Sequence, residues 1–151
     1  MADLFKLIKE YSSLDKKELI RIAREAFVRF DQSSNRNRND DFVAHMIGYV
    51  AYHADIKMSQ QEYNFFRLVT GYTYKDFDAF KSAYARTDME ATYSKLFDYM
   101  RNHFSLESKV ALLQICLCLC AYDGISSFER SYLQNFFGYE TTDAYYDYAE
   151  M

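Results

Sequence analysis

Apolar residues recur along most of the chain three and four positions apart, which is the spacing of one face of an α-helix. This pattern predicts a short amphipathic helix over residues 2–11, followed by a longer helix that Asp15 and Glu18 open as a capping box. Further helices are expected to begin near Asp41, Ser59, Thr73, Thr87, Ser105 and Thr142. The expected fold is all-α, with seven to eight helices.

The absence of proline supports the same fold. The 151 residues include no proline and only four glycines, so few positions interrupt a helix. The stretch from Asp31 to Asn39 is different, because every side chain in it is polar. Since this stretch has no apolar anchor, we expect it to form an exposed, mobile loop.

One pattern occurs twice in the chain. The first copy, ADIKMSQQE, begins at Ala54, and the second, AYDGISSFE, begins 67 positions later at Ala121. Each copy follows an apolar stretch and precedes an aromatic stretch that ends at Gly-Tyr. The duplication predicts two related helix pairs, over about 41–72 and 106–139, within a single domain that spans residues 1–151.

Each copy carries two carboxylates, which its loop turns toward the same corner. Asp55 and Asp123 lie at the C-terminal end of one helix, whereas Glu62 and Glu129 lie in the first turn of the next. A serine precedes each glutamate by three positions, so both glutamates are explained as capping-box residues. An aspartate at a helix C-terminus faces the negative pole of the helix dipole and needs a partner. That partner is a set of free amides, an arginine, or a cation bridging the aspartate and the glutamate.

Asp55, Glu62, Asp123 and Glu129 are therefore the candidate metal ligands. An EF-hand is excluded, because Phe128 stands where that calcium loop requires glycine. A weaker carboxylate site for a hard divalent cation, Ca²⁺ or Mg²⁺, remains open, and no other cofactor is indicated.

The duplicated motif resembles that of a known family. Ala-Asp-Gly after an apolar helix, then a small hydrophobic residue, Ser, two variable residues and Glu, is similar to the TerB family of tellurite resistance. It is also similar to the TerB-like module of DnaJ-like co-chaperones. The second copy is the better match, with Asp123, Gly124, Ile125, Ser126 and Glu129 in place, whereas the first has Ile56 where the family has glycine. We therefore expect positive φ at Gly124 but not at Ile56.

The resemblance, which covers residues 41–140, implies a compact helical domain whose two helix pairs are related by a pseudo-twofold axis. It also implies a stress-response role and metal binding by the acidic loops, without an established catalytic activity. A J-domain is excluded for this chain, because the sequence has no proline to form His-Pro-Asp. We expect a non-catalytic interaction or divalent-metal-sensing module with a protein partner.

The alternative is a metal-dependent hydrolase that uses the same four acidic residues. Such enzymes usually add histidine as a base or ligand, and the chain offers only His45, His53 and His103. His53 precedes Asp55 by two positions and so points elsewhere on its helix. No phosphate-binding loop or nucleophile motif is present, so binding is favoured over catalysis.

The distribution of charged and apolar residues indicates which partners and which cellular location to expect. Beyond residue 40 the chain has nine basic and fifteen acidic residues, which argues against nucleic acid as a partner. The five arginines between residues 21 and 38 are expected to form a solvated, salt-bridged face. The longest apolar run, 110–122, is too short to cross a bilayer, and no N-terminal leader is seen, so we expect a cytoplasmic protein.

The cysteines are expected to be structural. Cys116, Cys118 and Cys120 follow one another at spacings of two on one helix, so Cys118 points away from the other two. Four thiolates for a structural zinc site are not available. We expect all three residues to be buried and reduced.

Overall fold

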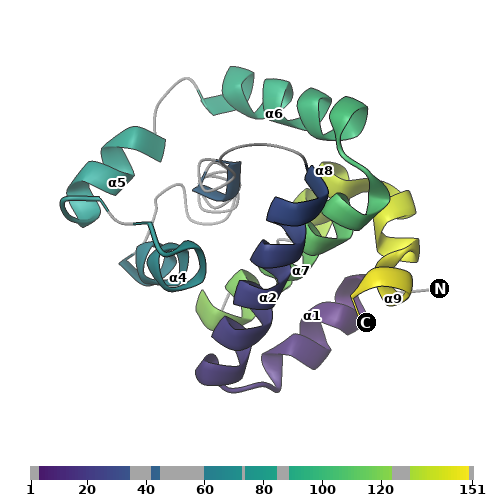
Figure 1. Ribbon diagram of the computed structural model, residues 1–151, viewed down its shortest axis with the longest axis horizontal. Coiled ribbons are helices and arrows are strands. Elements are labelled where there is room, and N and C mark those ends of the chain that lie inside the picture. The colour runs from purple at the N-terminus through teal and green to yellow at the C-terminus, as the bar shows by residue number, and fades with distance from the viewer. Residues whose placement is uncertain are drawn as a thin grey trace.

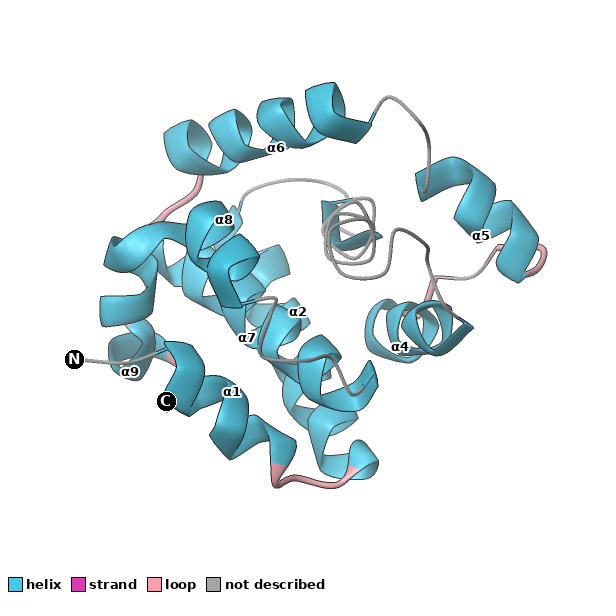
Figure 2. Ribbon diagram, turned by 180° about the vertical axis from the view of Figure 1, so that it is seen from behind, coloured by secondary structure: helices cyan, strands magenta, loops and turns pink. Residues whose placement is uncertain are grey.

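The computed structural model describes residues 4–34, 42–44, 60–72, 74–84, 89–123 and 130–149. Every regular element in these ranges is helical, and Figure 2 shows helices and connecting loops without a strand among them. In chain order the helices are α1 (Leu4–Ser12), α2 (Lys16–Ser34), α4 (Gln60–Thr70), α5 (Phe77–Tyr84), α6 (Met89–His103), α7 (Leu106–Asp123), α8 (Arg130–Asp143) and α9 (Tyr145–Tyr148). The predicted all-α fold is confirmed.

The helix α7 lies at the centre of the fold. It contacts α1, α2, α4, α8 and α9, and its most extensive contact is with α2 (Figure 1). All residues from 110 to 120 are buried, so three turns of this helix are covered on every side. A helix that is apolar around its whole circumference is stable only when other elements enclose it. The long apolar run in the sequence is therefore the core helix of the domain.

Aromatic rings fill much of the remaining core. The rings of Phe30 and Phe104 lie 5.2 Å apart at 81°, and Phe42 packs 5.0 Å from Phe104. A second group joins α5 to α4, where Phe80 lies 4.8 Å from Phe66 and 4.9 Å from Tyr63. Such tilted and edge-to-face pairs contribute attraction beyond the apolar area that they bury.

Side-chain caps begin several helices where the sequence indicated. The Glu18 N–H donates to Asp15 Oδ1 at 2.8 Å, which caps α2 as predicted. The carboxylate of Glu18, however, bonds Arg21. At the start of α7, the Ser108 N–H donates to Ser105 Oγ at 3.2 Å.

Two expected boundaries are wrong. The polar stretch from Asp31 was predicted as a loop, but α2 continues to Ser34. Polarity alone does not end a helix, and Ser33 Oγ docks 2.7 Å from Ser108 Oγ of α7. The predicted cap Thr73 lies outside the described residues, whereas α5 starts only at Phe77. Asp76 caps this helix, because the Ala79 N–H donates to its Oδ1 at 2.9 Å.

The two Gly-Tyr pairs share a backbone feature. Gly71 and Gly138 both have φ of 79°, in the region that favours glycine. The ψ of Gly138 is 169°, which differs from that of a left-handed helical cap, and α8 resumes beyond it to Asp143. Each predicted repeat therefore closes on a glycine with the same φ. The dihedral angles expected for Gly124 and Ile56 lie outside the described residues.

Candidate functional site

The structure describes two of the four predicted acidic residues. Glu62 lies in the first turn of α4, as predicted, and its residue exposure is only 1%. Asp123 is the last residue of α7, also as predicted. Asp55 and Glu129 lie outside the described residues. Among the residues that are described, no three histidine, cysteine, aspartate or glutamate side chains form a group suited to a metal ion.

A contact between α4 and α7 lies close in sequence to the described parts of the two motifs. The rings of Phe65 and Tyr122 lie 5.6 Å apart. Phe65 follows Glu62, the last residue of the first motif, by one helical turn, and Tyr122 directly precedes Asp123 of the second. We call this contact, together with Glu62 of α4 and the end of α7 at Asp123, the α4–α7 corner.

The burial of Glu62 constrains what the corner can hold. A buried carboxylate is costly unless it is protonated, hydrogen-bonded or paired with a positive charge. Sequence reasoning explained Glu62 as a capping residue on a helix surface, and its burial was not foreseen. One helical turn further along α4, Phe65 and Phe66 are also fully buried, so Glu62 lies on the face of α4 that packs into the core.

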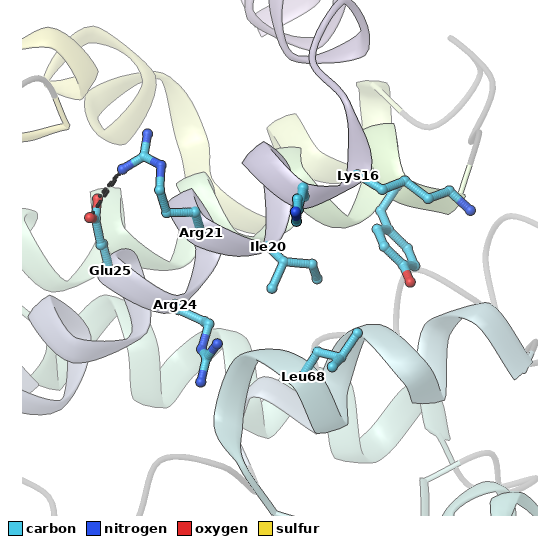
Figure 3. A pocket seen from close by; sticks show the side chains of 8 residues that line it. Lys16, Ile20, Arg21, Arg24, Glu25 and Leu68 are labelled. Atoms are coloured by element: carbon cyan, nitrogen blue, oxygen red, sulfur yellow. Dashed lines mark hydrogen bonds and ion pairs between the residues drawn. The ribbon is translucent and has the colours of Figure 1, made fainter.

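A second feature was missed from sequence. An open groove of about 490 Å³ lies between the first half of α2, α4 and the end of α7 (Figure 3). Its apolar surface comes from Ile20, Leu68 and Tyr122. Its charged lining consists of the cationic Lys16, Lys17, Arg21 and Arg24, together with Glu25. We call this site the basic groove.

Arg21 is already engaged at the edge of the groove. Its guanidinium bonds both Glu18 and Glu25, with 3.1 Å to each oxygen of Glu25. The hydrogen bond to Glu18 raises the pKa of Arg21, and the same bond lowers the pKa of Glu18. The predicted salt-bridged arginine face is thus confirmed for Arg21. Arg24 makes no such pair within the described ranges and points from α2 toward α4 in Figure 3.

Lys16 and Tyr122 form the far end of the groove. The Lys16 Nζ lies 4.7 Å from the centroid of the Tyr122 ring, a cation–π contact. Tyr122 therefore belongs to both the α4–α7 corner and the basic groove. The sequence signal for the groove was the placement of Lys17, Ile20 and Arg24 on one face of α2.

A chain of polar side chains crosses the core away from both sites. Arg29 of α2 donates to Gln114 Oε1 of α7, Tyr11 of α1 and Tyr145 of α9 share a hydrogen bond, and Gln114 lies near enough to Tyr11 to act on its pKa. Gln114 is 6% exposed and Tyr11 5%. We call these four residues the buried polar chain. Buried polar groups of this kind are stable when hydrogen-bonded to one another, so the chain ties four helices together.

The cysteines lie where the sequence placed them. Cys116, Cys118 and Cys120 are buried in α7 and form no disulfide within the described residues. Burial raises the pKa of Cys118. Among the histidines, His103 is described, and its ring stacks on Tyr99 with centroids 4.3 Å apart at the exposed end of α6.

Comparisons with known protein families, with curated proteins and with solved structures found no match. The resemblance to TerB-like proteins accordingly rests on the duplicated motif. Within the described residues, no helix has both the length and the apolar character to span a membrane.

Proposed function

We propose that this chain is a non-catalytic binding module of the TerB-like kind, with the α4–α7 corner as its site. The observation that carries the proposal is the contact between Phe65, one helical turn after the first motif, and Tyr122, within the second. The common φ of Gly71 and Gly138 supports the duplication behind it. The predicted ligand is Ca²⁺ or Mg²⁺, and the bound form would be the one that a protein partner recognises.

Electrostatics gives the corner a reason to bind a cation. Two carboxylates about 4 Å apart repel by about 4 kcal/mol at an effective dielectric constant near 20. If Asp55, Glu62, Asp123 and Glu129 converge as the motif predicts, a divalent cation relieves this repulsion and stabilises the folded state.

Thermal unfolding tests the metal proposal. Millimolar Ca²⁺ or Mg²⁺ should raise the Tm of the wild type, whereas Asp123→Asn should raise the Tm without metal and remove the response to metal. Asp143→Asn is the matched control, since Asp143 is exposed and is also the last residue of a helix. Wild-type curves that metal leaves unmoved would reject the cation site.

The hydrolase alternative depends on the same acidic residues, and an assay for catalytic turnover distinguishes it from the binding module. Metal-dependent hydrolysis of a nitrophenyl phosphate or ester, abolished by Asp123→Asn and retained by Asp143→Asn, would show that the chain is an enzyme and reject the non-catalytic proposal.

We further propose that the chain acts in a stress response in the cytoplasm, which the family resemblance supports.

A further inference from the structure

The basic groove carries positive charge that its own surroundings leave uncompensated. Glu25, the acidic residue of its lining, is held by Arg21 at 3.1 Å. Lys17 and Arg24 make no ion pair with any residue in the described part of the chain, and both are exposed. The whole chain has a net charge of −4, so this concentration of cations is local to the groove. A cationic surface of this kind attracts an anionic partner.

Apolar surface lies beside these charges. Leu68 is 43% exposed, and Figure 3 shows it facing Ile20 across the groove, with Arg24 beside them. Exposed apolar side chains framed by unpaired cations are typical of a surface that binds an apolar side chain and a carboxylate together. The ligand is therefore expected to be both acidic and apolar.

The spacing along α2 defines the shape of the ligand. Lys17 and Arg24 are seven positions apart, which corresponds to about 10.5 Å along a helix axis. Ile20 lies between them on the same face. A partner helix with two acids seven positions apart and leucines between them presents the complementary pattern, in either direction along the groove.

We infer that the basic groove binds an acidic amphipathic helix of a partner protein, with its acids at Lys17 and Arg24 and its leucines between Ile20 and Leu68. This inference rests on the proposal that the chain is a binding module. It assigns a site and a partner class that the α4–α7 corner does not supply.

Two other anionic partners fit the groove less well. A nucleic acid strand gains much of its affinity by stacking bases on aromatic rings, and the Tyr122 ring is covered by Lys16 at 4.7 Å. A membrane surface is flat on this scale, so it is less complementary to a groove between helices than a single partner helix is.

Fluorescence anisotropy of a labelled synthetic peptide tests the inference. The probe is a helical peptide containing Glu-Ala-Ala-Leu-Leu-Ala-Ala-Glu, and its control has the same composition with leucines and glutamates exchanged. The full chain is used in the presence of EDTA, so that a failure of the metal proposal does not affect the result. Circular dichroism confirms that each variant is folded.

The probe should bind saturably and more weakly as salt is raised. Lys17→Glu or Arg24→Glu should lower its affinity about tenfold, whereas Lys95→Glu, the same charge change on an exposed lysine of α6, should not. Leu68→Ala should lower the affinity about fivefold, and Tyr139→Ala, at a residue of α8 that is 76% exposed, should leave it unchanged.

Several results would overturn the inference. They are the absence of binding, equal affinity for the control peptide, or an equal loss in Lys95→Glu. Tighter binding of a single-stranded DNA oligonucleotide, or of anionic phosphatidylserine vesicles, in competition with the peptide would assign the groove to that ligand instead. If the peptide fails while metal still raises the Tm, only the groove is rejected. If metal fails while the peptide binds, only the cation site is rejected.

Discussion

Tyr11 of α1 and Tyr145 of α9 share a hydrogen bond between their phenolic oxygens, although 134 positions separate them in the chain. Their rings meet edge to face, with centroids 6.5 Å apart at 73°. Burial raises the pKa of Tyr11 to about 12 and also raises the pKa of Tyr145. The folded state therefore holds two phenolic protons that the unfolded chain releases at lower pH.

This pair predicts a loss of stability in alkali. The free energy of unfolding should be unaffected by these groups below about pH 10, the ordinary tyrosine pKa, and should fall as pH rises from there through about 12. Each retained proton contributes a slope of about 1.4 kcal/mol per pH unit in that window. Urea unfolding at a series of alkaline pH values measures it. Tyr11→Phe should flatten the slope, whereas Tyr139→Phe, at a residue that is 76% exposed, should not. An identical slope in Tyr11→Phe would show that another group titrates.

The buried polar chain predicts a coupling between Arg29 and Gln114. Gln114→Leu removes the acceptor of the Arg29 guanidinium, so it should destabilise the fold by about 1–3 kcal/mol. Arg29→Leu with Gln114→Leu should recover part of that loss, because no charged donor is then left without its acceptor. A double-mutant cycle by urea unfolding measures the coupling. Strictly additive losses would mean that the two side chains do not support each other.

Replacing Gly138 should strain the backbone without creating a steric clash. Its φ of 79° and ψ of 169° lie in a region that is open almost only to glycine, while an added Cβ would meet no atom within 4 Å. Gly138→Ala should therefore cost about 1–3 kcal/mol through strain alone. Tyr139→Ala, next in the chain and exposed, serves as the control in thermal or urea unfolding. A change below the error of the measurement would mean that the turn relaxes freely.

The cysteines predict slow thiol chemistry. Because Cys116, Cys118 and Cys120 are buried in the central helix and burial raises the pKa of Cys118, they should react with a disulfide reagent only when α7 opens. Absorbance of the released thiolate measures the rate, which should rise in parallel with unfolding as urea is added. A Ser82→Cys variant supplies an exposed thiol on α5 as the fast control. Wild-type labelling as fast as that of the variant would contradict the enclosure of α7.

Local patterns predicted the helices well, because caps and apolar spacing are properties of neighbouring residues. Asp15 and Ser105 both cap the helices that were expected after them. The same reasoning ended α2 too early at Asp31, since the contact that secures its last turn, between Ser33 and Ser108, joins residues 75 positions apart.

The candidate sites show the same limit. The positions of Glu62 and Asp123 at helix ends followed from the motif, but the burial of Glu62 depends on how α4 packs in the assembled fold. The basic groove could not be predicted as a site, because Leu68 and Tyr122 reach it from two other helices. From sequence, the cations of α2 were predicted to form a solvated, salt-bridged helix face. In the structure Arg21 is paired in this way, whereas Arg24 makes no ion pair with any described residue.

Because α1 and α9 both pack on α7, contacts with α7, rather than the covalent link from α1 to α2, hold α1 in place. A circular permutant that begins at Ser13 and carries α1 after α9, through a short linker, would return α1 to the same surface. The turn between α1 and α2 suits new ends, since Ser13 and Asp15 are exposed. If the rearranged gene yields an equally stable protein, a tag or a fused domain could be attached at that turn.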